Sequence, residues 1–497
     1  MKKRIIALLL FAAFAVGALA ACNNGNTEIS AGGSQSEGQD ESAAESVNPE
    51  SAWKDANGNW TIKQEVKDFK NRTFTICVRG SSVGTYQSDD FTTDGTLYGD
   101  TLNEAVNIRN NFVSDTYNVD LVVDKNDNYM NAIRNDIETL TGNYDAIMPA
   151  LSELAVLAGE GKLYELTSIP GFDISAPWYD SHATSAFSIQ NKVYFTTGDI
   201  TILNKVCAPS ILFNKEMIKS YHLDDPYQLV NDHQWTFDKL QQMAKAVVDL
   251  SSTDVYENTY GMLTEYNNPF DFFGAAGELI TVKDENDLPV LNLGGERSIS
   301  LAEKILDVYA NGDDWLIFGQ DSRFQGFSNS LKLFGTGHAL FRPSGFSAAT
   351  KLRKSSDVMF GILPYPLMDS TQDDYISYCG SSSDVAGIAI PLTAKDPEFS
   401  AYMIDAYSAS AKNYITHAYY DVNLRWKETY DNDSIAMLDL IFSHIVYDMG
   451  EAFDFGGVTT VFKELTAARS SNIVSRLDGI IDKAKIEIAE LREQYAD

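Results

Sequence analysis

Cysteine, histidine and basic residues are scarce in this sequence of 497 residues. It has four cysteines, six histidines, and 38 lysines and arginines against 70 aspartates and glutamates, which gives a formal net charge of −32. A chain this acidic repels nucleic acid, because binding requires lysine and arginine to neutralise phosphates. The sequence contains no H-E-x-x-H, no Walker A loop and no paired C-x-x-C. The common zinc-protease and phosphate-loop motifs are therefore missing, and no cofactor or metal is expected.

Long apolar runs are absent except at the N-terminus. Three basic residues at 2–4 precede an apolar run over 5–19, which is too short to span a bilayer comfortably. This arrangement predicts a secretory signal over residues 1–21. The run LAAC at 19–22 resembles the bacterial lipobox, which implies that Cys22 carries the lipid, palmitate included. The alternative is an ordinary signal followed by a cysteine that has no such role.

The segment after Cys22 predicts a flexible tether. From Asn23 to Ala52 the chain has no lysine, arginine or aromatic residue, so it cannot bury enough apolar surface to fold. We assign residues 22–55 to a lipidated, disordered tether, which would reach roughly 30 Å as a coil. The protein is expected outside the cytoplasm, on the outer face of the cell membrane. Two or more acyl chains would hold it there, without other contact to the membrane.

The other three cysteines cannot form a complete disulfide framework, because their number is odd. Cys77 lies in a strand-like run and is expected to be a small buried apolar residue. For Cys207 and Cys379 a bridge is conceivable in an exported protein, but we favour free thiols.

The body of the chain alternates predicted strands and helices, which indicates a parallel α/β sheet. Its length suits two lobes, each with its own core. The first set comprises strands at 73–78, 119–123 and 144–148 and helices at 102–113, 129–140 and 151–158. A second set begins with a strand at 210–214 and a helix that Thr236 is expected to cap. An apolar stripe at helical spacing over 477–491 closes the chain.

The run GSSVG at 80–84 matches the G-x-S-x-G pattern of a nucleophile elbow, with Ser82 as the serine. The mechanism requires a helix directly afterwards. Here the continuation TYQSDDFTTDG favours a loop. The plainer interpretation is a Gly/Ser loop at the carboxyl end of a strand, where open α/β sheets bind ligands.

Several aromatic residues stand in polar, loop-like surroundings. They are Trp178 and Tyr179 after a proline, Phe346 in the run RPSGF, and Tyr365 between two prolines. Flat apolar faces beside hydrogen-bonding groups suit a sugar ring. These residues are therefore candidates for contact with a ligand.

The order of these pieces resembles the extracellular solute-binding proteins of ABC importers, family 1, the carbohydrate-type group. The resemblance covers most of residues 71–420. Its carriers, besides the lipobox and tether, are YDAI at 144–147, GKLYEL at 161–166, KVYF at 192–195, ILFNK at 211–215, WTFDKL at 235–240, FGTGHALF at 334–341, FGILPYP at 360–366 and GIAIP at 387–391.

The resemblance implies a two-lobed type II periplasmic-binding-protein fold of the α/β class, with a ligand cleft between the lobes. It places residues 56–200 and 385–440 in the first lobe, and residues 201–384 and 441–497 in the second. Ligand would bridge the lobes and favour a closed state. The closed form would then dock on the ABC permease subunits.

Matching positions imply which residues bind the solute. Ser81 and Ser82 would act from the first lobe, Arg342 and Phe346 from the second, and Asp199 and Tyr365 near the crossovers, with Trp178 as a further candidate. No residue is expected to be catalytic. Cys207 departs from the family, because it stands at a crossover position where a polar group is expected, and this leaves the class of solute open.

We therefore predict a monomeric, lipid-anchored binding protein that delivers a small solute, most plausibly a sugar or oligosaccharide, to an ABC importer. Two alternatives stay open at this stage. One is an exported serine hydrolase that uses Ser82, and the other is a binding lipoprotein for peptide or another solute.

Overall fold

A computed structural model describes residues 49–92, 99–324, 326–420 and 432–495. The predicted signal, Cys22 and the tether up to residue 48 lie outside this part of the chain. Within it, no helix is long and apolar enough to cross a membrane. The predicted tether ends too late, because residues 49–53 form the 3₁₀ turn η1 (Pro49–Trp53). Its Trp53 is buried edge-on against Trp178, and this aromatic contact fixes the turn to the folded body.

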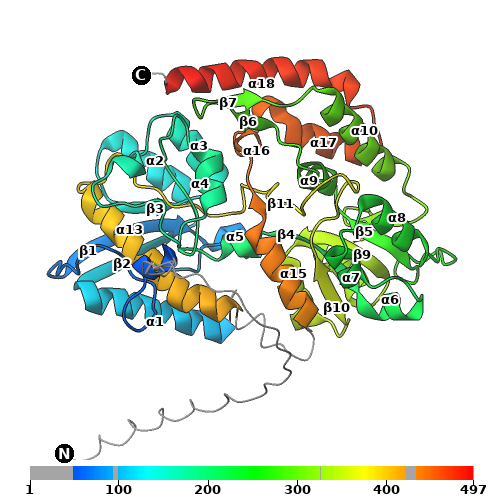
Figure 1. Cartoon of the computed structure of the whole chain (residues 1–497), viewed down its shortest axis with the longest axis horizontal. Helices are drawn as coiled ribbons and strands as arrows, with labels where there is room; N and C mark the ends of the chain where they lie inside the picture. Colours follow the sequence, from blue (N-terminus) through cyan, green and yellow to red (C-terminus); the bar gives the residue numbers. More distant parts are fainter. Residues whose placement is uncertain (1–48, 93–98, 325, 421–431, 496–497) are drawn as a thin grey trace, which may run out of the picture. The chain divides into compact units, whose positions relative to one another are not determined.

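The first sheet has three parallel strands, β1 (Arg72–Arg79), β2 (Val119–Asn126) and β3 (Ala146–Met148), in the order β2-β1-β3. All three were predicted from the sequence. The segment 386–391 runs antiparallel beside them, because Ala389 bridges Ile147 and Ala386 bridges Ala150. We call the body around this sheet lobe 1 (Figure 1).

Helices cover the sheet of lobe 1 and bury its apolar side chains. They are η2 (Ser81–Tyr86), α1 (Gly99–Tyr117), α2 (Tyr129–Thr139), α3 (Leu151–Gly159), η3 (Leu166–Ser168), α4 (Ser181–Phe187), α13 (Pro397–Ala411) and the π-helical turn η4 (Lys412–Thr416). Every residue of α13 from Phe399 to Ala411 is buried. A helix this apolar on all sides must lie inside the body rather than on its surface.

The second sheet has five strands, β4 (Pro209–Asn214), β5 (Tyr260–Thr264), β8 (Leu316–Phe318), β9 (Ala339–Gly345) and β10 (Phe360–Leu363). Their order is β10-β4-β9-β5-β8. The strand β4 runs antiparallel to both neighbours, whereas β9, β5 and β8 are parallel. We call the body around this sheet lobe 2 (Figure 1).

The remaining elements except α5 (Leu203–Val206) are grouped with lobe 2. Its helices are α6 (Lys215–Ser220), α7 (Pro226–Asn231), α8 (Phe237–Lys245), α9 (Asn268–Ala275), α10 (Glu296–Ala310), α11 (Phe327–Gly335), α12 (Ser347–Ser355), α15 (Asn432–Ser443), α16 (Met449–Ala452), η5 (Phe455–Gly457), α17 (Val458–Ala467) and α18 (Val474–Gln494). Its small strand pairs are β6 (Thr281–Lys283) with β7 (Pro289–Leu291), and β11 (Ser377–Tyr378) with β12 (Ile445–Val446). Of these elements, α16 also packs on α3 and β12 also packs on α4 of lobe 1. Thr236 caps α8 as predicted, because its side chain accepts from the amide of Lys239.

The position of α15 corrects one predicted boundary. Residues up to 440 were assigned to lobe 1, but α15 packs on β10 and α7 of lobe 2. The hydroxyls of Tyr227 and Ser434 are 2.6 Å apart across that contact. The apolar side chains of α15 cover the second sheet, so the helix belongs to lobe 2.

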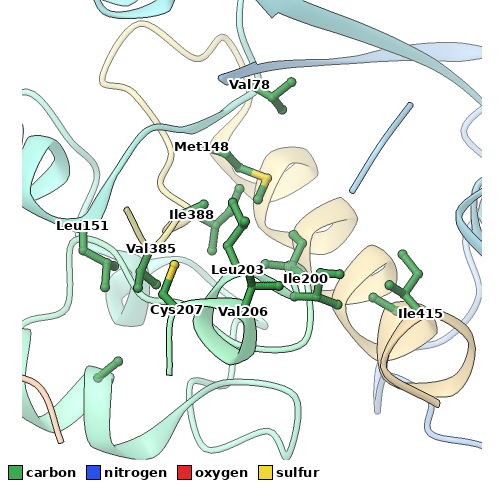
Figure 2. Close-up of a cluster of buried hydrophobic side chains, with 14 of the residues drawn as sticks. Val78, Met148, Leu151, Ile200, Leu203, Val206, Cys207, Val385, Ile388 and Ile415 are labelled. Atoms are coloured by element: carbon green, nitrogen blue, oxygen red, sulfur yellow. The ribbon is translucent and has the colours of Figure 1, made fainter. Parts of the chain in front are cut away.

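The chain passes between the two sheets at residues 197–208, which include α5 (Leu203–Val206), and again at 379–384. Figure 2 shows a cluster of buried apolar side chains beside these passages. Its labelled members are Val78, Met148, Leu151, Ile200, Leu203, Val206, Cys207, Val385, Ile388 and Ile415.

Candidate functional site

Residues that follow strands of both lobes influence the pKa of Tyr86. Burial raises the pKa of Tyr86, and Cys207 and Asp384 raise it further. A hydrogen bond with the Ser347 side chain lowers the pKa, and Glu265 raises it. Tyr86 belongs to the loop after β1, whereas Glu265 directly follows β5 and Ser347 follows β9. We call Tyr86, Glu265, Ser347 and Asp384 the interlobe cluster.

A buried ion pair supports the lobe 2 side of this cluster. Arg342 of β9 is fully buried, and its Nη2 donates to the Oε1 of Glu265 at 2.8 Å. Burial lowers the pKa of Arg342, while Glu265 raises it. The pKa of Lys351 on α12 is lowered by burial and by the charge of Arg342. The cluster therefore supplies carboxylate acceptors, and the neighbouring Arg342 and Lys351 supply cationic donors, a pattern that suits a ligand with many hydroxyl groups.

The predicted serines lie at the lobe 1 edge of the same region. Ser81 and Ser82 are exposed and begin η2, the short helix that ends at Tyr86. The amide of Ser82 donates to Oδ1 of Asp127 at 2.8 Å, and its hydroxyl donates to the backbone carbonyl of Asp127. A nucleophilic serine would instead donate to a general base. The run at 80–84 thus forms a 3₁₀ turn rather than the predicted open loop, and Ser82 is not oriented as in a nucleophile elbow.

Phe346 and Tyr365 lie outside the interlobe cluster. Phe346 is 1% exposed and packs edge-on against Phe442 of α15 at a ring distance of 5.9 Å. Tyr365 is also 1% exposed, and its hydroxyl donates to Asp271 at 3.3 Å. Both rings are therefore core residues, Phe346 in the apolar cluster that includes the lobe 1 core and Tyr365 in the second apolar cluster.

Trp178 and Asp199 line a separate cavity beside the first passage, with a volume of about 680 Å³. Trp178 is 1% exposed, and its indole N–H donates to Asp405 of α13 at 3.3 Å. Asp199 accepts from Lys205 at 3.2 Å, from Lys412 at 2.9 Å and from Thr416 at 2.8 Å. Burial raises the pKa of Asp199, but the two lysines outweigh it and hold the pKa below its ordinary value.

We call Asp199, Lys205, Lys412 and Thr416 the Asp199 cluster. Asp199 and Lys205 come from the first passage, and Lys412 and Thr416 come from η4. The carboxylate thus joins two distant parts of the chain beside the passage. The structure does not bring Asp199 together with the predicted serines.

All three described cysteines are free and buried, so Cys207 and Cys379 do not form the conceivable bridge. Burial raises the pKa of each thiol. Within the described ranges, no group of three or more His, Cys, Asp or Glu side chains could hold a metal ion.

Sequence reasoning missed Tyr86, Glu265, Ser347, Asp384 and Lys351. Tyr86 lies four residues beyond Ser82, in the same loop that the Gly/Ser run identified. Glu265 is the first residue after β5, a β-rich run at 260–264 that the sequence analysis did not single out. The end of a parallel strand is the position where such sheets present ligand-binding groups. Reading every first residue after a strand would have found it.

Comparisons with known proteins agree on the fold. No family model matches the chain, and no curated protein matches it in sequence. Among solved structures it is similar to a cyclo/maltodextrin-binding protein complexed with maltotetraose, with a TM-score of 0.56 and 14% identity over 85% of this chain and 98% of that one. A maltose-binding periplasmic protein of Listeria monocytogenes in complex with maltose gives a TM-score of 0.54 and 13% identity over 86% and 100%.

An ABC substrate-binding protein of Listeria monocytogenes in complex with cycloalternan gives a TM-score of 0.54 and 12% identity over 84% and 99% of the two chains. In each comparison the similarity covers nearly all of the solved chain and most of this one. The two sheets of this chain, with helices between their strands, are consistent with that fold. The chain therefore has the two-lobed α/β fold of the periplasmic binding proteins.

Proposed function

We propose that this protein captures a small extracellular solute, a sugar or oligosaccharide, between its lobes and delivers it to an ABC importer. The observation that carries the proposal is the interlobe cluster, where Glu265 and Ser347 of lobe 2 both shift the pKa of Tyr86 of lobe 1, and where Glu265 is held by the buried Arg342 at 2.8 Å. A solute held there would contact both lobes and so favour the closed state over the open one.

The chemistry of the cluster favours a polyhydroxylated solute. Glu265 and Asp384 offer carboxylate oxygens as acceptors, and Lys351, which lies outside the cluster but feels the charge of Glu265, offers donors. Tyr86 adds an aromatic face with a hydroxyl at its edge. Structures similar in fold were solved with maltotetraose, cycloalternan, maltose and ribitol, all of which carry several hydroxyl groups.

The N-terminal sequence supports delivery at the membrane. A signal over residues 1–21 and a lipid on Cys22 would place the folded body outside the cell on a tether. This location keeps a captured solute close to the permease subunits. We assign no catalytic role to the chain.

A thermal-shift screen tests the proposal. Maltose, maltotetraose, cycloalternan, ribitol and a set of peptides are each added to the purified protein. A sugar at 100 times its Kd adds about 2.7 kcal/mol to the stability of the folded state, which is a readily measured shift. A shift with peptides and none with any sugar would contradict the carbohydrate assignment.

A matched pair of variants locates the site. Glu265→Gln should lower the affinity for the sugar at least tenfold, because the uncharged amide is a weaker acceptor for hydroxyl groups. Glu303→Gln on the exposed surface of α10 is the control and should leave the affinity unchanged. Equal affinity in both variants would place the ligand elsewhere. Turnover of an ester or glycoside that disappears in Ser82→Ala would favour the hydrolase instead.

A further inference from the structure

The loop that carries Ser81, Ser82 and Tyr86 starts and ends at a buried charged residue. Arg79 stands at the end of β1 and Asp90 at the end of the loop, and neither has any exposed surface. The amide of Ser88 donates to the carbonyl of Arg79 at 3.1 Å, which closes the base of the loop. We call residues 80–89 the interlobe loop.

Asp90 joins one end of the interlobe loop to the first passage between the lobes. Its Oδ2 accepts from the hydroxyl of Thr201 at 2.9 Å, and its Oδ1 accepts from the amide of Ile202 at 3.0 Å. Arg109 of α1 donates to the backbone carbonyl of Asp90, and its guanidinium lies 4.3 Å from the ring of Phe91. Both carboxylate oxygens of Asp90 are thus committed to the passage.

Arg79 joins the other end of the interlobe loop to the second passage. Its Nη1 donates to the carbonyl of Ser383 at 3.3 Å, and its Nη2 donates to the carbonyl of Asp384 at 2.6 Å. Asp384 is itself a member of the interlobe cluster. Each end of one ten-residue loop is therefore bonded to a different segment that connects the lobes.

We propose that Arg79 and Asp90 are positioning residues, which keep the interlobe loop in register with both passages so that movement at the passages also moves Tyr86. This inference rests on the proposed function, because it concerns how the lobes close on a solute. It adds a physical connection between the passages and the loop, made of two buried charged groups with named partners.

The physical reason lies in the cost of breaking these bonds. A buried charged group that loses its partners keeps the full penalty of its desolvation. The loop is therefore bonded to a passage at each of its ends, through Arg79, the last residue of β1, and through Asp90. The loop and the passages are thus connected by specific hydrogen bonds, and not only by residues that happen to lie between them.

Amide hydrogen exchange on the ligand-free protein tests the proposal. Asp90→Ala removes both acceptors. Thr201→Val keeps the shape of the side chain but removes two hydrogen bonds, the one that the hydroxyl donates to Asp90 and the one that it accepts from the amide of Leu203. Because the second bond lies inside the passage, exchange in the interlobe loop is the decisive readout for this variant. Asp89→Ala is the matched control, because Asp89 is equally buried and adjacent but pairs with Lys125 of β2 within lobe 1. Exchange is followed at residues 81–88 and at 201–206.

In Thr201→Val and Asp90→Ala, exchange should accelerate at least tenfold in both segments. In Asp89→Ala it should accelerate in the loop alone, with the passage as in the unchanged protein. A Thr201→Val protein whose loop exchanges at the original rate would overturn the proposal, and so would an Asp89→Ala protein that loosens the passage equally. If Asp90→Ala does not fold, Thr201→Val decides the question.

A second measurement uses maltotetraose as the probe. Thr201→Val should lower the affinity for maltotetraose at least threefold while its unfolding midpoint stays close to that of Asp89→Ala. A merely structural role would change the midpoint and the affinity together. An affinity equal to that of the unchanged protein would contradict coupling to the site. The exchange experiment contains no solute, so failure of the sugar assignment and failure of the coupling give different results.

Discussion

Replacing Asp199 with asparagine tests how the Asp199 cluster is stabilised. The carboxylate is the shared partner of Lys205 and Lys412, whose side chains are 11% and 24% exposed. Removing one member of a buried ion pair costs about 3–5 kcal/mol, because the other charge stays buried without a partner. Both lysines retain some contact with water, so we expect the low end, about 3 kcal/mol, for Asp199→Asn.

Two further variants separate charge from shape. Thr416→Val removes only a hydrogen bond to a charged group and should cost about 1.5 kcal/mol. The triple variant Asp199→Leu, Lys205→Met, Lys412→Met removes all three charges together, and its stability should lie within about 1 kcal/mol of the original. The assay is urea denaturation at pH 7, followed by tryptophan fluorescence.

The pH dependence gives an independent check. The pKa of Asp199 is lowered on folding. Its contribution is therefore fully present above its unfolded pKa of about 3.9 and is lost as the pH falls through the lower folded value. The gap between the original protein and Asp199→Asn should narrow below about pH 3.9. A triple variant as unstable as Asp199→Asn at pH 7 would refute the reasoning from charge.

Three other substitutions have clear expected outcomes. Gly274→Ala in α9 should lower the melting temperature by several degrees, because the added Cβ would lie 2.0 Å from the buried ring of Tyr378; an unchanged melting temperature would show that the ring moves freely. Glu451→Gln should raise stability at pH 9 and much less at pH 5. Burial raises the pKa of Glu451 to about 8, so the original protein loses stability as the pH rises from the pKa of the unfolded chain toward 8. Parallel curves of melting temperature against pH for the two proteins would refute this. Thr236→Ala should cost about 1 kcal/mol in urea denaturation, through loss of the cap on α8.

The strands of lobe 1 could be predicted because local sequence decides them. Residues 73–78 and 119–123 are runs rich in β-branched and apolar side chains, and they became β1 and β2. The order of the second sheet was beyond prediction, since the neighbours of β4 are β9 and β10, which come much later in the chain. No local pattern states which distant strands will pair.

Some residues that the sequence indicated lie in or beside the proposed site, and their role in binding stays a prediction. The Gly/Ser run identified the interlobe loop, and Arg342 was found beside the cluster as the buried partner of Glu265. Trp178 was chosen for its polar surroundings in sequence, but its indole N–H is bonded to Asp405, which lies 227 residues away. A contact over that distance in the chain turns an apparently exposed ring into a core residue.

The late return of the chain to lobe 1 has a consequence for biogenesis. Lobe 1 is completed only by the segment 386–391 and by the wholly buried helix α13, both of which are made after most of lobe 2. A chain exported from its N-terminus exposes the uncovered apolar side chains of lobe 1 until those residues arrive, and such intermediates aggregate. A chain that ended before residue 386 would therefore leave the sheet of lobe 1 without its covering segment and without α13.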